Sequence, residues 1–174
     1  MSTNLLVKQT ATVWQGADGA TFDVIEDGSP LSAMTLRAGL DDLVSPMQKI
    51  MSYMLLDDGS KVRLPFIEIT CIIPDRTGII AIFNPGQYLK PDGTDFFSYP
   101  NNAAIFNADG RLRFQLECDY GHRIAAFHSG SMKPQYKGMM GVLMATHADS
   151  PPEWVYAVDP TSPKLIRTGQ WVRW

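Results

Sequence analysis

The sequence predicts a mainly β protein, with an α+β organisation as the alternative, whose antiparallel sheet meanders into a sandwich or a partly open barrel. Three observations predict this class: repeated Asp-Gly pairs, short apolar and β-branched runs between most of them, and one convincing helical pattern. An Asp-Gly pair is typical of a tight hairpin turn, because glycine adopts positive φ freely and aspartate tolerates it. The pairs are Asp18-Gly19, Asp27-Gly28, Asp58-Gly59, Asp92-Gly93 and Asp109-Gly110.

Length, composition and charge set the outer limits. The chain has 174 residues, 45% of them hydrophobic, which is enough for one substantial core, so we expect a single domain over residues 1–174. The formal net charge is −3 and the pI is near 5.5, so no global basic field attracts nucleic acid or anionic lipid. Residues 1–87 carry 6 Lys and Arg against 10 Asp and Glu. This excess indicates either a solvated acidic surface or a surface that favours a basic partner.

The first elements predicted are a hairpin and a helix. Residues 10–15 pair with residues 21–26 through the first Asp-Gly turn. Apolar residues then recur at spacings of three and four, which predicts one short helix near residues 45–54 with a capping box at its start. The alternative makes residues 52–56 a strand that pairs with residues 61–66. The apolar residues concerned are Leu40, Leu43, Val44, Met47, Ile50, Met51 and Met54.

The rest of the chain predicts further strands. The apolar face switches parity near Pro65, so we expect a bulge or a break there. The uninterrupted apolar run at residues 79–83 is the best candidate for the centre of a sheet. A clear hairpin joins residues 104–106 to residues 112–116 across Asp109-Gly110. Later strands are expected at residues 122–128, 139–146, 153–158 and 170–174, separated by glycine and proline.

The longest irregular segment spans residues 84–102 and is rich in aromatic residues. Long loops often carry function, and large rings supply much contact area. The alternative is that these rings fold back as a lid over the core. The aromatic residues are Tyr88, Phe96, Phe97 and Tyr99.

Catalytic and cofactor motifs are mostly missing from the sequence. It contains no phosphate-binding glycine loop, no Gly-x-Ser-x-Gly elbow, no His-Glu-x-x-His helix and no Cys-x-x-Cys pair, so we lean against an enzyme and expect no cofactor. Four metal-ligand residue types lie close together, at Cys118, Asp119, His122 and His128. In a strand, however, the two histidines would be about 20 Å apart at ~3.3 Å per residue, so we predict no metal site.

The cysteines and both ends of the chain give further expectations. The short apolar stretch after Met1 is not typical of a signal peptide, and no run approaches the ~20 apolar residues of a membrane span, so we expect a cytoplasmic protein outside membranes. Cys71 and Cys118 are then expected to remain thiols. Cations and indoles near the C-terminus are interpreted as an edge strand, because nucleic-acid binding needs a wider basic field. This group comprises Lys164, Arg167, Trp171, Arg173 and Trp174.

Three motifs follow one another within residues 99–167: a Pro-Asn entry at residues 100–101, an Asp-Gly hairpin at residues 109–110 and a late aromatic strand at residues 154–159. In these motifs the chain resembles small bacterial β-sheet proteins of uncharacterised or toxin-immunity type. Phe114 stands where such proteins commonly have tryptophan, and residues 160–162 replace their usual Thr-Gly turn. The resemblance implies a cytoplasmic, non-catalytic protein that binds a cognate partner, and it assigns no functional residues.

The sequence therefore predicts a protein-binding module, most sharply an immunity-like inhibitor of a partner protein. The expected contact residues are the loop aromatics and two acidic pairs that would face a basic partner surface. The alternative is a β-barrel or sandwich that holds a small molecule, as an enzyme if a histidine lies beside a carboxylate in its pocket. The acidic pairs are Asp41 with Asp42 and Asp57 with Asp58.

Overall fold

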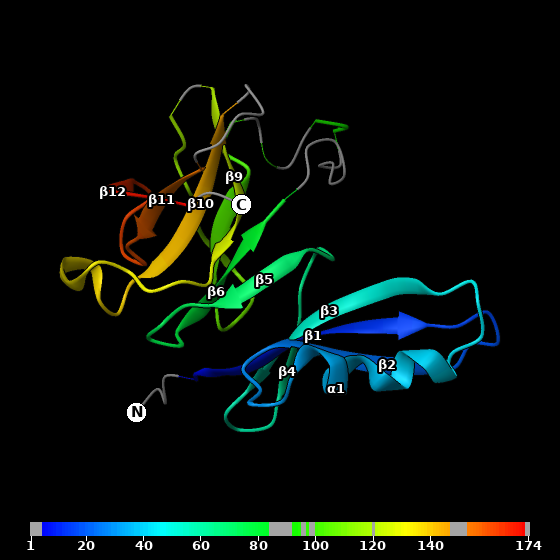
Figure 1. Ribbon diagram of the computed structural model, residues 1–174. Helices are drawn as coiled ribbons and strands as arrows, with labels where there is room; N and C mark the ends of the chain where they lie inside the picture. Colours follow the sequence, from blue (N-terminus) through cyan, green and yellow to red (C-terminus); the bar gives the residue numbers. More distant parts are fainter. Residues whose placement is uncertain are drawn as a thin grey trace. The chain divides into compact units, whose positions relative to one another are not determined.

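In the residues that it describes, the computed structural model contains three four-stranded antiparallel sheets and a short helical segment between the second and third strands, which confirms the mainly β class (Figure 1). It describes residues 5–83, 92–94, 97, 100–119, 121–146 and 153–172. The chain packs as two compact units. Residues 1–79 with 106–111 form the first unit, and residues 80–105 with 112–174 form the second. The single domain expected from length stays a prediction.

The first sheet has the strand order β2-β1-β3-β4. Its strands are β1 (Val7–Gln15), β2 (Thr21–Asp27), β3 (Gln48–Leu56) and β4 (Lys61–Arg63). The β1–β2 hairpin confirms the predicted pairing, with Trp14 opposite Phe22 and Val13 opposite Asp23. β1 also pairs with β3, so the sequence-adjacent hairpin is extended by a strand that begins more than twenty residues later.

Both faces of the first sheet bury side chains along β1 and β3. On one face, Thr12 and Ser52 lie opposite each other and share a hydrogen bond of 3.2 Å between their hydroxyls. On the other face, Ala11, Val13 and Tyr53 form a small buried cluster. A strand buried on both faces shows no alternation of apolar and polar residues. The two-residue period that normally identifies a strand is therefore missing from β3.

The helix predicted near residues 45–54 is wrong, because β3 occupies most of that segment. Ile50, Met51 and Met54 fit a helical spacing only because apolar side chains leave β3 on both faces, and Met47 lies one residue before this strand. The observed helix lies earlier, as α1 (Ala33–Arg37) followed by the 3-10 turn η1 (Ala38–Asp42). The alternative interpretation is confirmed: the end of β3 pairs with β4 across Asp58-Gly59, with Leu55 opposite Lys61.

The five Asp-Gly pairs all place glycine in the left-handed region, with φ between 81° and 85°. In four of them, one aspartate oxygen accepts a hydrogen bond from the backbone N–H two residues later, as Asp18 does from Ala20. The exception is Asp27, which accepts from Gly28 and, over 2.7 Å, from the backbone N–H of Ile72. The Asp27-Gly28 pair therefore forms a turn and also connects the end of β2 to β5 through the Asp27 carboxylate.

The second sheet has the strand order β5-β6-β7-β8. Its strands are β5 (Ile69–Ile72), β6 (Gly78–Ile82), β7 (Ala103–Asn107) and β8 (Leu112–Gln115). Every residue of β6 is buried, as the continuous apolar run predicts. The break expected near Pro65 is confirmed, since β4 ends at Arg63 and β5 begins at Ile69. Backbone packing is close at Gly78, where a β-carbon would collide with the carbonyl oxygen of Phe106.

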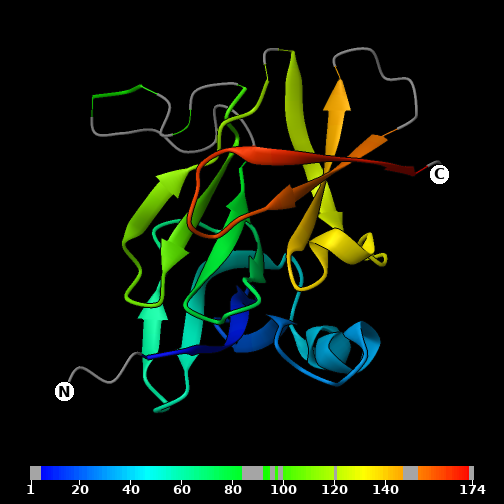
Figure 2. The same ribbon diagram turned by 90° about the vertical axis from the view of Figure 1, so that its left-hand side faces the viewer.

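The third sheet is a simple meander with the strand order β12-β11-β10-β9 (Figure 2). Its strands are β9 (His122–His128), β10 (Met140–Thr146), β11 (Glu153–Val158) and β12 (Leu165–Val172), and the short turn η2 (Pro134–Tyr136) lies between β9 and β10. The predicted bounds of β9 and β11 are confirmed to the residue. β12 begins five residues earlier than expected.

Candidate functional site

The connection between β2 and β3 exposes an unusual number of apolar side chains. No residue of α1 or η1 is buried, and Met34 has 83% of its surface exposed. Asp41 and Asp42 lie exposed at the end of η1, in the same connection. We call this set the α1–η1 surface. It consists of Leu31, Met34, Asp41, Asp42, Val44 and Met47.

Specific local contacts nevertheless fix the position of this connection. The Ser32 hydroxyl accepts a hydrogen bond of 3.2 Å from the backbone N–H of Thr35 and so caps α1. Gly39 packs directly on the ring of Phe22, where a β-carbon would overlap the ring atoms. The carbonyl oxygen of Val44 accepts a hydrogen bond of 2.8 Å from the N–H of Ala17. The α1–η1 surface is thus exposed although its backbone is held against β2.

A tryptophan side chain close to this connection has an unsatisfied donor. Trp14 on β1 lies opposite Phe22 on β2, and the indole N–H of Trp14 is buried without an acceptor among the described residues. The Lys49 ammonium lies 5.3 Å from the centre of the Trp14 ring. A buried donor without a partner costs free energy, so such groups often mark sites that water or a ligand completes. No pattern in the sequence predicts this buried indole N–H.

The second acidic pair lies in the β3–β4 turn and already has partners within the chain. The Asp57 carboxylate forms an ion pair with Arg76, whose Nε also donates to the carbonyl oxygen of Val7. The Asp58 carboxylate accepts hydrogen bonds from the hydroxyl and the backbone N–H of Ser60, and these bonds lower the pKa of Asp58. Asp58 remains exposed and charged. Asp57 offers less unpaired charge to a partner than Asp41 and Asp42 do.

Of the four loop aromatics, only Phe97 lies within the described residues; Tyr88, Phe96 and Tyr99 lie outside them. Phe97 has 7% of its surface exposed and stacks on Phe83 with ring centres 3.8 Å apart. It therefore packs in the core and presents little surface to a partner.

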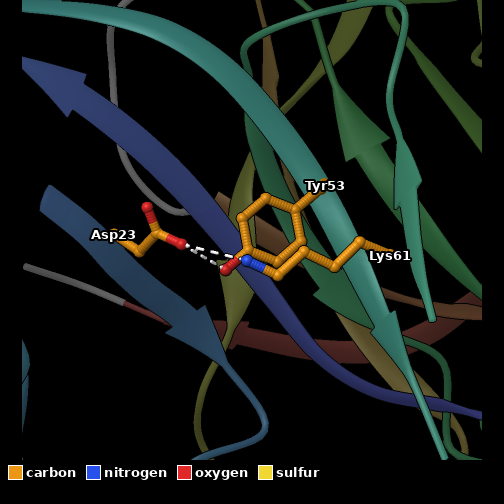
Figure 3. A network of polar contacts seen from close by, with 3 residues as sticks. All are labelled: Asp23, Tyr53 and Lys61. Atoms are coloured by element: carbon orange, nitrogen blue, oxygen red, sulfur yellow. Dashed lines mark hydrogen bonds and ion pairs between the residues drawn. The ribbon is translucent and has the colours of Figure 1, made fainter. Parts of the chain in front are cut away.

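Three polar side chains from three strands of the first sheet meet in one network (Figure 3). The Tyr53 hydroxyl on β3 donates to Asp23 Oδ2 on β2 over 2.7 Å. Lys61 on β4 lies 3.4 Å from the same oxygen, with its ammonium 4.3 Å from the centre of the Tyr53 ring. These contacts cross β1 at Ala11, whose small side chain lies opposite Tyr53.

The pKa shifts in this network indicate a structural role and not a catalytic one. Burial, followed by the hydrogen bond to Asp23, raises the pKa of Tyr53, so the phenol stays protonated at neutral pH. Its contacts with Tyr53 and then Asp23 raise the pKa of Lys61, which stays charged. A nucleophile or general base needs the opposite shifts. The three side chains therefore tie β2, β3 and β4 together.

The remaining reactive residue types do not assemble into a metal site within the described ranges, where no group of three metal-binding side chains occurs. His122 and His128 lie at the two ends of β9. Both cysteines are free thiols. Burial raises the pKa of Cys71 to about 12 and that of Cys118 to about 11, so neither is an activated nucleophile.

Within the described residues, no helix is long and apolar enough to cross a membrane. Comparison with known proteins gave no match to a family model, to a curated protein or to a solved structure.

Proposed function

We propose that this protein is a non-catalytic protein-binding module that binds a basic partner protein through the α1–η1 surface. The observation that supports this most directly is the exposure of large apolar side chains beside Asp41 and Asp42 on a connection whose backbone is fixed. An inhibitor of the immunity type is the sharpest form of the proposal.

The apolar part of the surface favours a protein partner. Leu31, Met34, Val44 and Met47 all lie within seventeen residues of chain and all are exposed. Exposed apolar patches rimmed by polar groups are typical of interaction sites. Methionine adapts its shape to a partner, and burial of one large apolar side chain contributes roughly 1.5–3 kcal/mol before the costs of association.

The charge of the surrounding unit favours a basic partner. The first unit carries 7 Lys and Arg against 11 Asp and Glu, and Asp41 and Asp42 form no ion pair with the described residues. Complementary charge speeds association and orients the partner. The apolar side chains would then supply most of the affinity, and the two carboxylates would supply orientation and rate.

Site-specific photo-crosslinking tests this function. A photoreactive amino acid at position 34 is expected to capture one partner protein from the native cell, and the same group at position 112 is not. Leu112 is a suitable control because it is apolar and 47% exposed but lies on β8. With the captured partner purified, Met34→Gln is expected to weaken binding about 10-fold, and Asp41→Lys with Asp42→Lys at least as much.

The control variant for affinity is Asp57→Asn with Asp58→Asn, which changes exposed acids outside the α1–η1 surface. It is expected to bind within about 2-fold of the wild type. Equal affinity for the wild type and for the Met34 and Asp41-Asp42 variants would refute the assignment of this surface. Equal capture from positions 34 and 112 would do the same.

A further inference from the structure

Two tryptophans and one arginine lie on one face of the third sheet. Trp154 on β11 lies directly opposite Trp171 on β12, and Tyr156 lies opposite Arg167. Directly opposite residues of an antiparallel pair share a face, so all four side chains leave the sheet on the same side. The Arg167 guanidinium carbon lies 4.8 Å from the centre of the Trp154 ring. We call Trp154, Arg167 and Trp171 the tryptophan–arginine patch (Figure 2 shows its strands in orange and red).

Arg167 is fixed in place but keeps its hydrogen-bonding capacity. Its side chain is exposed, and among the residues that the structure describes it lies over the Trp154 ring and forms no ion pair and no hydrogen bond. Stacking on an indole restricts the guanidinium plane without using its five N–H donors. Arginine binds phosphate and carboxylate through two parallel hydrogen bonds. The patch therefore presents an oriented site for an anionic group.

The second part of the patch is an aromatic surface. Trp171 is 49% exposed on the edge strand β12, whereas Trp154 is partly buried beneath Arg167. Burial raises the pKa of the neighbouring Tyr156, the positive charge of Arg167 opposes that shift, and the negative charge of Asp119 adds to it to a smaller extent, which places both charges near Tyr156. An exposed indole is a stacking surface for a flat ring. A ligand that uses the whole patch must combine a flat ring with an anionic group.

We propose that the tryptophan–arginine patch binds a nucleoside monophosphate, with the phosphate on the Arg167 guanidinium and the base stacked on the Trp171 indole. Inorganic phosphate would leave the indole unused, and a neutral ring would leave the guanidinium unpaired. The patch holds one unpaired cation, and the chain has a net charge of −3, so a single nucleotide fits better than a nucleic-acid strand, which requires many cations. This site lies in the second unit and is independent of the proposed protein-binding function.

Calorimetric titration of the full chain with AMP, adenosine and inorganic phosphate tests the site. We expect AMP to bind one-to-one with a Kd of about 1 mM or lower, and adenosine and phosphate to bind about 10-fold more weakly each. In proton–nitrogen correlation spectra, AMP is expected to shift the indole resonance of Trp171 and to leave that of Trp14, in the first unit, unchanged. A resonance map centred elsewhere would overturn the assignment, and it needs no variant that risks misfolding.

Two variants and one control locate the interaction. Arg167→Lys keeps the positive charge but loses the planar fork, and Trp171→Leu keeps an apolar side chain but loses the ring. Each is expected to weaken AMP binding about 10-fold. Lys164→Gln removes a cation from just before β12 and is expected to change binding less than about 2-fold. The proposal is overturned if AMP does not saturate the protein, if both variants bind like the wild type, or if only oligonucleotides bind.

Discussion

The raised pKa of Tyr53 makes the stability of the first sheet depend on pH in the alkaline range. Because the pKa of Tyr53 is raised above 10.0 in the fold, the protonated phenol stabilises the native state below that pH, and the contribution is lost as the pH rises above it. The raised pKa of Lys61 acts in the same direction above 10.5. We expect the free energy of unfolding, measured by urea titration, to fall as the pH rises above 10.

Tyr53→Phe separates the hydrogen bond from the ring. The variant loses the bond to Asp23 and is expected to unfold with about 1 kcal/mol less free energy at pH 8, with a weaker dependence on alkaline pH. Tyr136→Phe, in η2, is the matched control, because it removes a phenol outside the network. An alkaline slope as steep in Tyr53→Phe as in the wild type would show that other groups cause it.

The two thiols give a second prediction for single residues. With pKa values of about 12 and about 11, Cys71 and Cys118 hold only on the order of one thiolate in a thousand or fewer at pH 8. We expect iodoacetamide to alkylate both much more slowly in the folded protein than in urea, with Cys71 the slower, as followed by mass spectrometry. Folded-state labelling as fast as that in urea would contradict the assigned burial.

At the scale of elements, the sequence predicts those strands whose side chains obey a simple pattern. β6 is an unbroken apolar run, and β9 and β11 are bounded by clear glycine and proline breaks. β3 has apolar side chains on both faces and few β-branched residues, so its spacing matches a helix equally well. The tertiary pairing with β1 decides between the two, and no local pattern contains that information.

The true helix has a weak signal that does exist in the sequence. Ser32, two residues after Pro30, is a favourable N-cap residue, and its hydroxyl accepts a hydrogen bond from the backbone N–H of Thr35. Two features hide it: α1 is only five residues long, and Gly39 interrupts the pattern in η1. Gly39 has a packing role on Phe22 that becomes visible only when β2 is placed.

Among the side chains that connect one element to another, Asn102 is the one whose substitution we expect to lower the free energy of unfolding most. Its side-chain oxygen accepts a hydrogen bond from the N–H of Ile124 over 2.9 Å, and its side-chain nitrogen donates one to the carbonyl oxygen of Ile124 over 2.8 Å. These two bonds satisfy backbone groups of β9 that a neighbouring strand would otherwise pair. Asn102 is buried, and its own carbonyl accepts from the N–H of Phe83. Asn102→Ala leaves two buried backbone groups without partners, so we expect it to lower the free energy of unfolding by about 3 kcal/mol.

Asn101→Ala is the matched control for this residue. Asn101 is only partly buried, and its side chain accepts one hydrogen bond, from the N–H of Cys118. Its loss is expected to cost about 1 kcal/mol in the same urea titration. If the two substitutions lower the free energy of unfolding equally, the hydrogen bonds of the Asn102 side chain to β9 do not contribute more to stability than the single bond of Asn101.

For the whole molecule, the sequence indicates acidic contact residues but not the surface that they belong to. Asp41 and Asp42 are visible in the sequence as an exposed pair, whereas the exposure of Leu31 and Met34 is not, because apolar residues at helical spacing are normally buried. The aromatic loop gives the converse case, since Phe97 looks available in the sequence and is packed on Phe83. Exposure depends on what covers a residue, which is decided by contacts far away in the chain.

The exposed apolar side chains and the low net charge together predict how the molecule behaves near its pI. At pH 7 the net charge of −3 keeps copies apart, but near pH 5.5 that repulsion vanishes and the α1–η1 surface can bury itself against another copy. We expect turbidity to reach a maximum at about pH 5.5. Leu31→Gln with Met34→Gln should reduce that maximum strongly, and Leu112→Gln, which removes one exposed apolar side chain on β8, should reduce it little. If the double variant precipitates as the wild type does, apolar contact through α1–η1 is not what drives association, and the affinity assigned to that surface loses its physical basis.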